Sequence, residues 1–239
     1  KEGEKCKVFL VTHAPFVEGD ITRSFLAKRV VKIYDKTISR LTLNKFDKII
    51  TISNWEIPHI IKCGADSKKI IYLPNGIPEE LFKQKKAKEE RKIIFLGRIS
   101  PKKKIETLIE SIALINDKKI NLEIIGPKEK EYFNYLKHII DKKKLNGRIK
   151  FLSPVFDIKE KIEKLDSGKI YVLPSRVEGM PQALVEAMAR GKMVIGSNSI
   201  AIRELIKDGK NGYLFEFNNP KDLAEKIDRA LLSENKKIG

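Results

Sequence analysis

The sequence predicts an α/β fold built around parallel β-sheets. From Arg91 onward, short apolar runs alternate with longer amphipathic segments, which is the pattern of repeated β-α units. Turn residues follow several of the apolar runs, namely Gly97, Gly126-Pro127 and Pro174-Ser175. Because doubly wound folds bind ligands at the carboxyl ends of their strands, we expect the functional site beside these turns.

The larger, second part of the chain accounts for most of the predicted elements. Each short apolar run is assigned to a strand and each amphipathic interval to a helix. The strands are predicted at 92–96, 122–125, 149–152, 170–173, 193–195 and 212–215. The helices are predicted at about 102–116, 128–144, 157–165, 181–190, 200–207 and 220–233.

The first part of the chain repeats this pattern in shorter form. Ser53 is predicted to be the N-cap of the second of its two helices. A unit of this size buries too little apolar surface to be stable alone. The chain also opens without an initiator methionine, directly before a strand-like run at Lys7, so we expect upstream sequence to be missing. The strands are predicted at 7–12, 48–52 and 70–73, and the helices at about 21–45 and 54–62.

A boundary between two domains is predicted near residue 77. Residues 74–78 are dense in turn-forming Pro, Asn and Gly, and residues 83–92 are charged and poorly periodic. We therefore expect one domain over 1–77 and a second over 78–239.

The composition predicts a folded protein with a lysine-rich, solvated surface. Of 239 residues 41% are hydrophobic, and the formal net charge is +17. Lysines are interleaved with Asp and Glu along the whole chain, as on solvated helix faces. Attraction to an anionic membrane or to a lipid-phosphate acceptor is the main alternative. We expect no nucleic acid partner, because the chain has no aromatic-basic cluster of the kind that recognises RNA.

The cysteine content predicts a cytoplasmic protein. Cys6 and Cys63 have neither the number of a disulfide framework nor the spacing of a metal site. No stretch approaches the roughly 20 consecutive apolar residues of a membrane-spanning helix. We therefore expect a reducing compartment and no metal, with peripheral contact at an anionic membrane as the alternative location.

The first motif with chemical content follows the predicted strand at 92–96. Gly97 lets the backbone turn at the strand end, and Arg98 and Lys103 follow in a basic segment that opens a helix. Cations beside a helix N-terminus suit a diphosphate. In a chain this basic, a glycine, an arginine and a run of lysines also occur by chance, so this motif alone does not fix the role.

The second motif lies between the predicted strand at 170–173 and the helix that Pro181 opens. The amides from Gly179 to Ala183 are expected to face one point with the positive end of the helix dipole behind them, which suits a phosphate or a sugar oxygen. Glu186, further into the helix, can accept hydrogen bonds from a diol such as ribose. The alternative is that Glu178 is an acid favoured by the dipole and Glu186 a solvent-facing helix residue.

Together these motifs resemble a known family, the retaining GT-B glycosyltransferases of family four, also called the group 1 glycosyltransferases. The resemblance covers essentially the whole chain. It implies a GT-B fold, with a complete Rossmann-like C-terminal donor domain and the C-terminal part of a Rossmann-like N-terminal domain that binds the acceptor. It rests on Asn75-Gly76, Gly97-Arg98 with Lys103, the pair Glu178 and Glu186 with seven residues between them, and the segment from Glu204 to Gly212.

The resemblance implies a role for each matching residue. Arg98 and Lys103 are expected to bind the donor diphosphate, Glu178 the donor sugar and Glu186 the ribose. His13 matches a histidine at a strand end of the acceptor domain that faces the donor sugar, so His13 and Glu178 are the catalytic candidates. Contacts to sugar and phosphate are expected from the loop residues Gly179, Met180, Pro181 and Gln182.

The reaction that the resemblance implies is a retaining sugar transfer without metal or other cofactor. A hexose or acetamido-hexose passes from a UDP-, GDP- or ADP-sugar donor to a lipid-linked or glycan acceptor. Two alternatives stay open, a nucleotide-sugar 2-epimerase of the same fold and a non-catalytic relative that binds sugar nucleotides.

The sequence departs from the family pattern at two places. Lys104 stands where a glycine is usual, and it is expected to add a cation beside the phosphate site. Ile200-Ala201 replaces a common Gly-Gly pair, which removes two small residues and argues against a close backbone approach to the ligand there.

Overall fold

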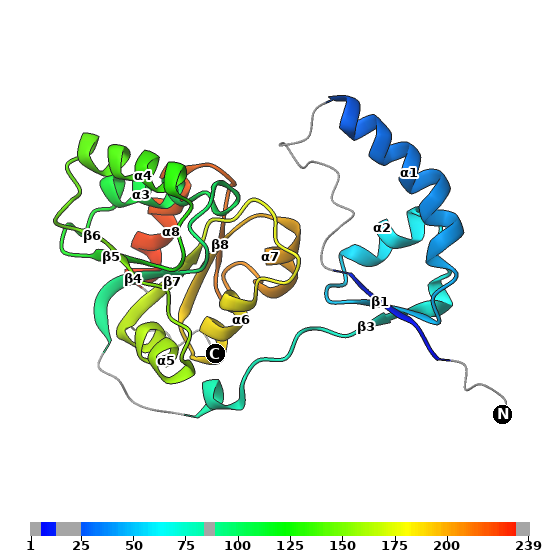
Figure 1. Cartoon of the computed structure of the whole chain (residues 1–239). Coiled ribbons are helices and arrows are strands. Elements are labelled where there is room, and N and C mark those ends of the chain that lie inside the picture. Colours follow the sequence, from blue (N-terminus) through cyan, green and yellow to red (C-terminus); the bar gives the residue numbers. More distant parts are fainter. Residues whose placement is uncertain (1–5, 13–24, 84–88, 233–239) are drawn as a thin grey trace. The chain divides into compact units, whose positions relative to one another are not determined.

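The chain consists of two compact units, Lys1–Gly76 and Ile77–Gly239 (Figure 1). The computed structural model describes residues 6–12, 25–83 and 89–232. Each unit has its own sheet, and all strands in it are parallel, so the predicted α/β class is confirmed. No helix within the described ranges combines the length and the apolar character that crossing a bilayer requires.

The first unit contains a parallel sheet with the strand order β1-β2-β3. In its described part the apolar core is small and centres on Leu43, Ile49 and Ile60, while Phe9 and Leu41 are 50% and 71% exposed. Its elements are β1 (Phe9–Thr12), α1 (Phe25–Leu43), β2 (Lys48–Thr51), α2 (Glu56–Lys62), the 3-10 helix η1 (Ser67–Lys69) and β3 (Ile70–Tyr72).

The start of α2 differs from the prediction. Ser53 is not its N-cap, because the helix begins at Glu56 and the N-cap is Trp55, which makes no side-chain capping hydrogen bond. The Ser53 carbonyl instead accepts a hydrogen bond from the Thr51 hydroxyl at 2.8 Å. The strand end and the helix start are thus joined by a turn that delays the helix by two residues relative to the predicted start at 54.

The second unit is a doubly wound α/β structure. The six strands predicted from the sequence are all present, with ends shifted by up to two residues. The elements are η2 (Glu79–Phe82), β4 (Glu90–Leu96), η3 (Pro101–Lys103), α3 (Ile105–Leu114), β5 (Asn121–Ile125), α4 (Lys130–Lys142), β6 (Ile149–Leu152), α5 (Ile158–Ser167), β7 (Gly168–Leu173), α6 (Gln182–Ala189), β8 (Met193–Ser197), α7 (Ile200–Leu205), β9 (Tyr213–Phe215) and α8 (Pro220–Leu232).

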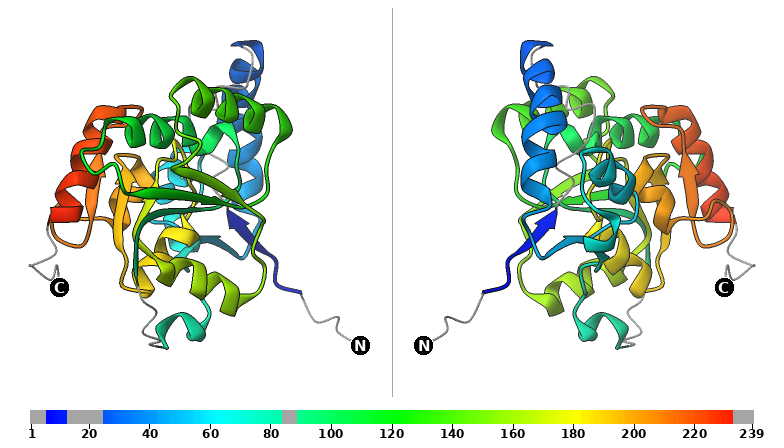
Figure 2. Two further views of the ribbon diagram at one scale, coloured as in Figure 1. Left: turned by 90° about the vertical axis from the view of Figure 1, so that its left-hand side faces the viewer. Right: turned by 90° about the vertical axis from the view of Figure 1, so that its right-hand side faces the viewer.

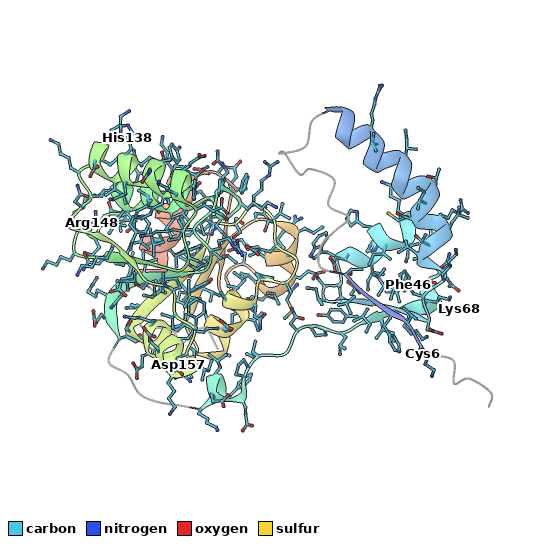
Figure 3. All side chains as sticks on the ribbon, viewed as in Figure 1. Cys6, Phe46, Lys68, His138, Arg148 and Asp157 are labelled. Atoms are coloured by element: carbon cyan, nitrogen blue, oxygen red, sulfur yellow. The ribbon has the colours of Figure 1, made fainter. Side chains whose placement is uncertain are left out.

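The sheet of the second unit has the order β6-β5-β4-β7-β8-β9. Helices α3, α4 and α8 pack on one face, and α5 and α6 lie on the other together with η2 (Figures 1 and 2). The middle of β4 is buried on both faces, since Ile93, Ile94 and Phe95 are at most 1% exposed, as expected for a central parallel strand covered by two helix layers. Asp157 caps α5 by accepting hydrogen bonds from the amides of Lys159 and Glu160 (Figure 3).

The helix predicted over 102–116 is broken at Lys104. This residue adopts the left-handed conformation (φ 50°, ψ 43°) between η3 and α3. Its ammonium pairs with Glu106 at 3.1 Å, and Glu106 also accepts a hydrogen bond from the Tyr132 hydroxyl. A left-handed backbone is the physical reason why glycine suits this position.

We expect Lys104→Gly to raise the free energy of unfolding by about 0.5–1 kcal/mol, because relief of the left-handed conformation outweighs the small loss of a partly exposed ion pair. Urea unfolding followed by circular dichroism measures the change. Lys144→Gly is the matched control, since Lys144 is also left-handed (φ 54°) and no described group pairs with its side chain. A loss of stability in Lys104→Gly beside a gain in Lys144→Gly would show that the ion pair matters more than the backbone.

Candidate functional site

The strand order places a topological switch point between β4 and β7. The chain runs from β4 outward to β5 and β6 on one side, then returns to β7 and continues to β8 and β9 on the other. The chain therefore continues from β4 and from β7 toward opposite sides of the sheet, and the carboxyl edge at such a switch point is where open α/β sheets bind ligands. Both motifs singled out in the sequence lie on the loops that follow β4 and β7.

The loop after β4 is fixed along one side by the loop after β5. The amides of Gly97 and Ile99 donate to the carbonyls of Ile125 and Pro127, at 2.9 and 2.7 Å. Gly126 has a φ of 147°, and a Cβ there would overlap the carbonyl oxygen of Gly97. A glycine at 126 is thus required for the close approach of the two loops.

The loop after β4 is fixed along its other side by β7 and the loop after it. The amide of Arg176 donates to the Lys102 carbonyl at 3.0 Å, and the hydroxyl of buried Tyr171 donates to the Leu96 carbonyl at 3.2 Å. Burial, together with the charges of Glu178 and Glu186, raises the pKa of the Tyr171 hydroxyl well above its usual value. Tyr171 is therefore a neutral hydrogen-bond donor that supports the end of β4.

An ion pair joins the two predicted motifs. The Lys103 ammonium lies 2.6 Å from Oε1 of Glu178, and the two side chains are 23% and 12% exposed. Lys103 belongs to η3 and Glu178 to the loop after β7, so two residues 75 positions apart meet beside the switch point of the sheet. The two residues were predicted from separate motifs, and the structure brings them together in one cluster.

Glu186 is a buried acid on α6. Its side chain is only 5% exposed, and its Oε1 lies 2.9 Å from the Lys161 ammonium on α5. The interpretation of Glu186 as a solvent-facing helix residue is therefore wrong. Because a buried carboxylate is unfavourable without a partner, Lys161 is needed to keep this charge in place.

The remaining residues of the cluster line the start of α6 and the end of β4. Pro181 is buried as the N-cap of α6, Gly179 and Met180 are half-buried, and Gln182 is exposed. The amides of Leu184 and Val185 already donate to the Pro181 carbonyl, so what this end of α6 offers a ligand is the positive end of the helix dipole. Arg98 is exposed, and no described group forms a hydrogen bond or ion pair with its guanidinium.

Two expectations concern residues away from this cluster. His13 lies outside the described residues, directly after Thr12 at the end of β1. In place of the common Gly-Gly pair, Ile200 is 44% exposed and Ala201 is buried in the first turn of α7.

Within the described ranges, no three His, Cys, Asp or Glu side chains are grouped as a metal site requires, and metal independence stays a prediction.

Sequence reasoning missed Lys161 and Tyr171. Lys161 is one of four lysines between 159 and 169, and nothing in the sequence separates it from the solvated ones. Tyr171 sits inside an apolar strand, where a tyrosine is expected as core. Only the packing of α5 brings Lys161 to Glu186, and only the register of β7 beside β4 brings the Tyr171 hydroxyl to the Leu96 carbonyl.

Comparison with known proteins gives a family and a fold. Residues 76–237 match the model of the family described as glycosyl transferases group 1. An uncharacterized glycosyltransferase of Methanocaldococcus jannaschii is 34% identical over 191 residues, which cover 76% of this chain and 48% of that protein. The crystal structure of Anabaena HepE in complex with UDP superposes with a TM-score of 0.79 at 21% identity, over 97% of this chain and 64% of that chain.

A relative with a named activity covers a similar share. The N,N'-diacetylbacillosaminyl-diphospho-undecaprenol alpha-1,3-N-acetylgalactosaminyltransferase of Campylobacter jejuni is 28% identical over 203 residues, or 81% of this chain and 50% of that protein. The chain thus spans about half of the length of the curated relatives that it matches.

Proposed function

The chain belongs to the group 1 glycosyltransferases and shares their GT-B fold, and we propose that it transfers sugar from a nucleoside-diphosphate sugar. The second unit binds the donor and the first unit contributes to acceptor binding. The observation that carries this proposal is the meeting of Lys103 with Glu178 at 2.6 Å, at the switch point of the sheet and beside the N-terminus of α6. A cation and an acid thus meet beside a helix N-terminus, which suits a ligand that has both phosphates and hydroxyls.

The donor is held at two ends in this proposal. Arg98, Lys103 and the positive end of the α6 dipole hold the diphosphate, because charge-assisted hydrogen bonds and a helix N-terminus both favour phosphate. Glu178 accepts hydrogen bonds from the sugar and Glu186 from the ribose, since ionised carboxylates only accept. Gly179, Met180, Pro181 and Gln182 are proposed to contact the sugar and the phosphates.

The chemical step is a transfer to an acceptor hydroxyl with retention of the anomeric configuration. As the bond between sugar and diphosphate breaks, negative charge grows on the leaving diphosphate, and the fixed cations Arg98 and Lys103 stabilise it. In a front-face attack the leaving phosphate accepts the acceptor's proton. We propose His13 as a catalytic residue together with Glu178, on the family resemblance alone.

The proposed donor and acceptor classes follow those of the relatives. HepE was crystallised with UDP, with UDP and glucose, and with UDP-glucose, and the Campylobacter relative is named for a lipid diphosphate acceptor. We propose a hexose or acetamido-hexose donor, a lipid-linked or glycan acceptor, and a cytoplasmic location at which the acceptor lipid brings the enzyme to the membrane surface.

A transfer assay tests the proposed function. Radiolabelled UDP-, GDP- and ADP-sugars are incubated with lipid-diphosphate sugars or glycan fragments, and the product linkage is determined by NMR. We expect label in an acceptor with the donor's anomeric configuration, and no label with the double variant Arg98→Ala/Lys103→Ala. Label that stays on the nucleotide with every acceptor, or a 2-epimer formed without acceptor, would overturn the proposal.

The role of Glu186 gives a separate prediction. We expect Glu186→Gln to weaken the affinity for a ribonucleoside diphosphate about 10-fold, because a charged acceptor for the ribose hydroxyls is lost. Calorimetry with the 2′,3′-dideoxy nucleotide should give the same affinity for parent and variant. Lys161→Met should reproduce the effect and Lys161→Arg should not. An equal loss with the dideoxy ligand would rule out the ribose assignment.

A further inference from the structure

Lys103 and Glu178 form an ion pair with one another, although the proposed complex gives each of them a different partner. Lys103 is proposed to bind phosphate and Glu178 to bind sugar hydroxyls, whereas here the ammonium and the carboxylate are 2.6 Å apart. Both side chains are largely shielded from water, at 23% and 12% exposure. A ligand that binds Lys103 therefore weakens this ion pair. Glu178 is compensated only if the ligand also supplies hydrogen-bond donors to its carboxylate.

The pair cannot be relieved by separating the loops that carry it. The hydrogen bond from the Arg176 amide to the Lys102 carbonyl holds the segment before Lys103 against the segment before Glu178. The hydroxyl of Tyr171 donates a hydrogen bond to the Leu96 carbonyl and so keeps the end of β4 in place. Any exchange of partners must come from rotation of the two side chains, with their backbones in place.

Arg98 differs from Lys103 in this respect. It is exposed, and no hydrogen bond or ion pair engages its guanidinium within the described part of the chain. It can bind the first phosphate without giving up a contact. Lys103 gives up part of its interaction with Glu178 when it turns to the diphosphate, and the diphosphate then brings like charge close to Glu178, which is unfavourable.

We propose that the Lys103–Glu178 ion pair makes this site discriminate a nucleoside-diphosphate sugar from the bare nucleoside diphosphate. The inference rests on the proposed function. The hydroxyls of a donor sugar give Glu178 new hydrogen-bond donors when Lys103 turns to the phosphates. A bare nucleoside diphosphate offers none, so Glu178 is left facing phosphate with a weakened partner. The donor is thus favoured over the product that remains after transfer, and the product leaves more readily.

Glu178→Gln separates the two ligands in a calorimetric titration. We expect the variant to bind the nucleoside diphosphate about fivefold more tightly, because a neutral amide holds Lys103 less strongly than the carboxylate does and a negative charge is removed. We expect it to bind the nucleotide sugar about tenfold more weakly, because a charged acceptor for the sugar is lost. Glu178→Ser is the second variant, and thermal unfolding checks that both are folded.

Glu129→Gln is the matched control for the change in net charge. Glu129 is exposed at the N-cap of α4, by the carboxyl end of β5, and no ion pair with a described cation involves its side chain. Its replacement should leave both affinities unchanged. Lys103→Ala should weaken both ligands, which separates loss of the cation from loss of the acid.

Three results would contradict the discrimination or the proposed function, and they can be told apart. If the parent binds both ligands and Glu178→Gln binds the nucleoside diphosphate no more tightly, the pair does not oppose the product and the discrimination is refuted alone. A gain of similar size in Glu129→Gln would refute it as well, by showing a general effect of charge. If the parent binds neither ligand, the proposed function fails together with the inference.

Discussion

We expect Asp166→Ala to lower the free energy of unfolding by about 3–5 kcal/mol, because it leaves a buried arginine without its counter-charge. The Asp166 carboxylate accepts hydrogen bonds from Nε and Nη2 of Arg190, at 2.8 and 2.7 Å, and the two side chains are about 5% exposed. Arg190 also donates to the carbonyls of Leu81 and Lys83, so the pair ties α5 and α6 to η2. Urea unfolding followed by circular dichroism measures the loss.

A surface pair provides the comparison for this prediction. Arg91 and Asp117 are 2.6 Å apart, but their side chains are 60% and 21% exposed, and Arg91→Ala should cost less than about 1 kcal/mol. The double variant Asp166→Leu/Arg190→Met removes the unpaired charge and should recover part of the stability. A loss in Asp166→Ala as small as that in Arg91→Ala would show that the buried pair is not needed.

Arg98→Ala and Lys103→Ala should each weaken the binding of a nucleoside diphosphate by about 1.5–3 kcal/mol, the range of hydrogen bonds to charged groups. The physical reason is the loss of a cation at the end of β4, where the diphosphate is proposed to lie. The effect of Arg98→Ala is expected to be fully electrostatic, since its guanidinium is exposed and packs in no core. Calorimetric titration at two ionic strengths measures both variants.

The free nucleoside is the control ligand for these two variants. It shares the base and ribose with the diphosphate but lacks the phosphates, so its affinity should change little. Lys102→Ala is the matched control variant, because Lys102 is an exposed neighbour whose backbone carbonyl, and not its side chain, supports the site. Equal losses for nucleoside and diphosphate would show that Arg98 and Lys103 do not hold phosphate.

The sequence predicted the strands of the second unit because their apolar runs are short and bounded by turn residues. It failed at the ends of helices, where hydrogen bonds decide the boundary. Ser53 has the right side chain for an N-cap, yet Thr51 bonds to its carbonyl and the helix starts after Trp55. Lys104 gave no sign of its left-handed backbone apart from the glycine that usually stands there.

The sequence indicated candidate residues for the site but not their pairings. Arg98, Lys103, Glu178 and Glu186 were proposed from strand ends, helix starts and the family resemblance, and their roles stay predictions. That Lys103 faces Glu178 depends on β4 and β7 being neighbours in the sheet, which the order of motifs along the chain does not reveal. That Glu186 is buried on Lys161 depends on how α5 packs.

Titration of the chain with UDP, GDP and ADP and with the matching free nucleosides tests the proposed donor site most directly. We predict that one of the three diphosphates binds with a Kd on the order of 10 µM to 1 mM, equivalent to roughly 4–7 kcal/mol. The matching nucleoside should bind much more weakly, because Arg98, Lys103 and the start of α6 recognise the phosphates. Absence of binding by all three diphosphates, or a nucleoside that binds as tightly as its diphosphate, would contradict a phosphate-binding site between β4 and β7.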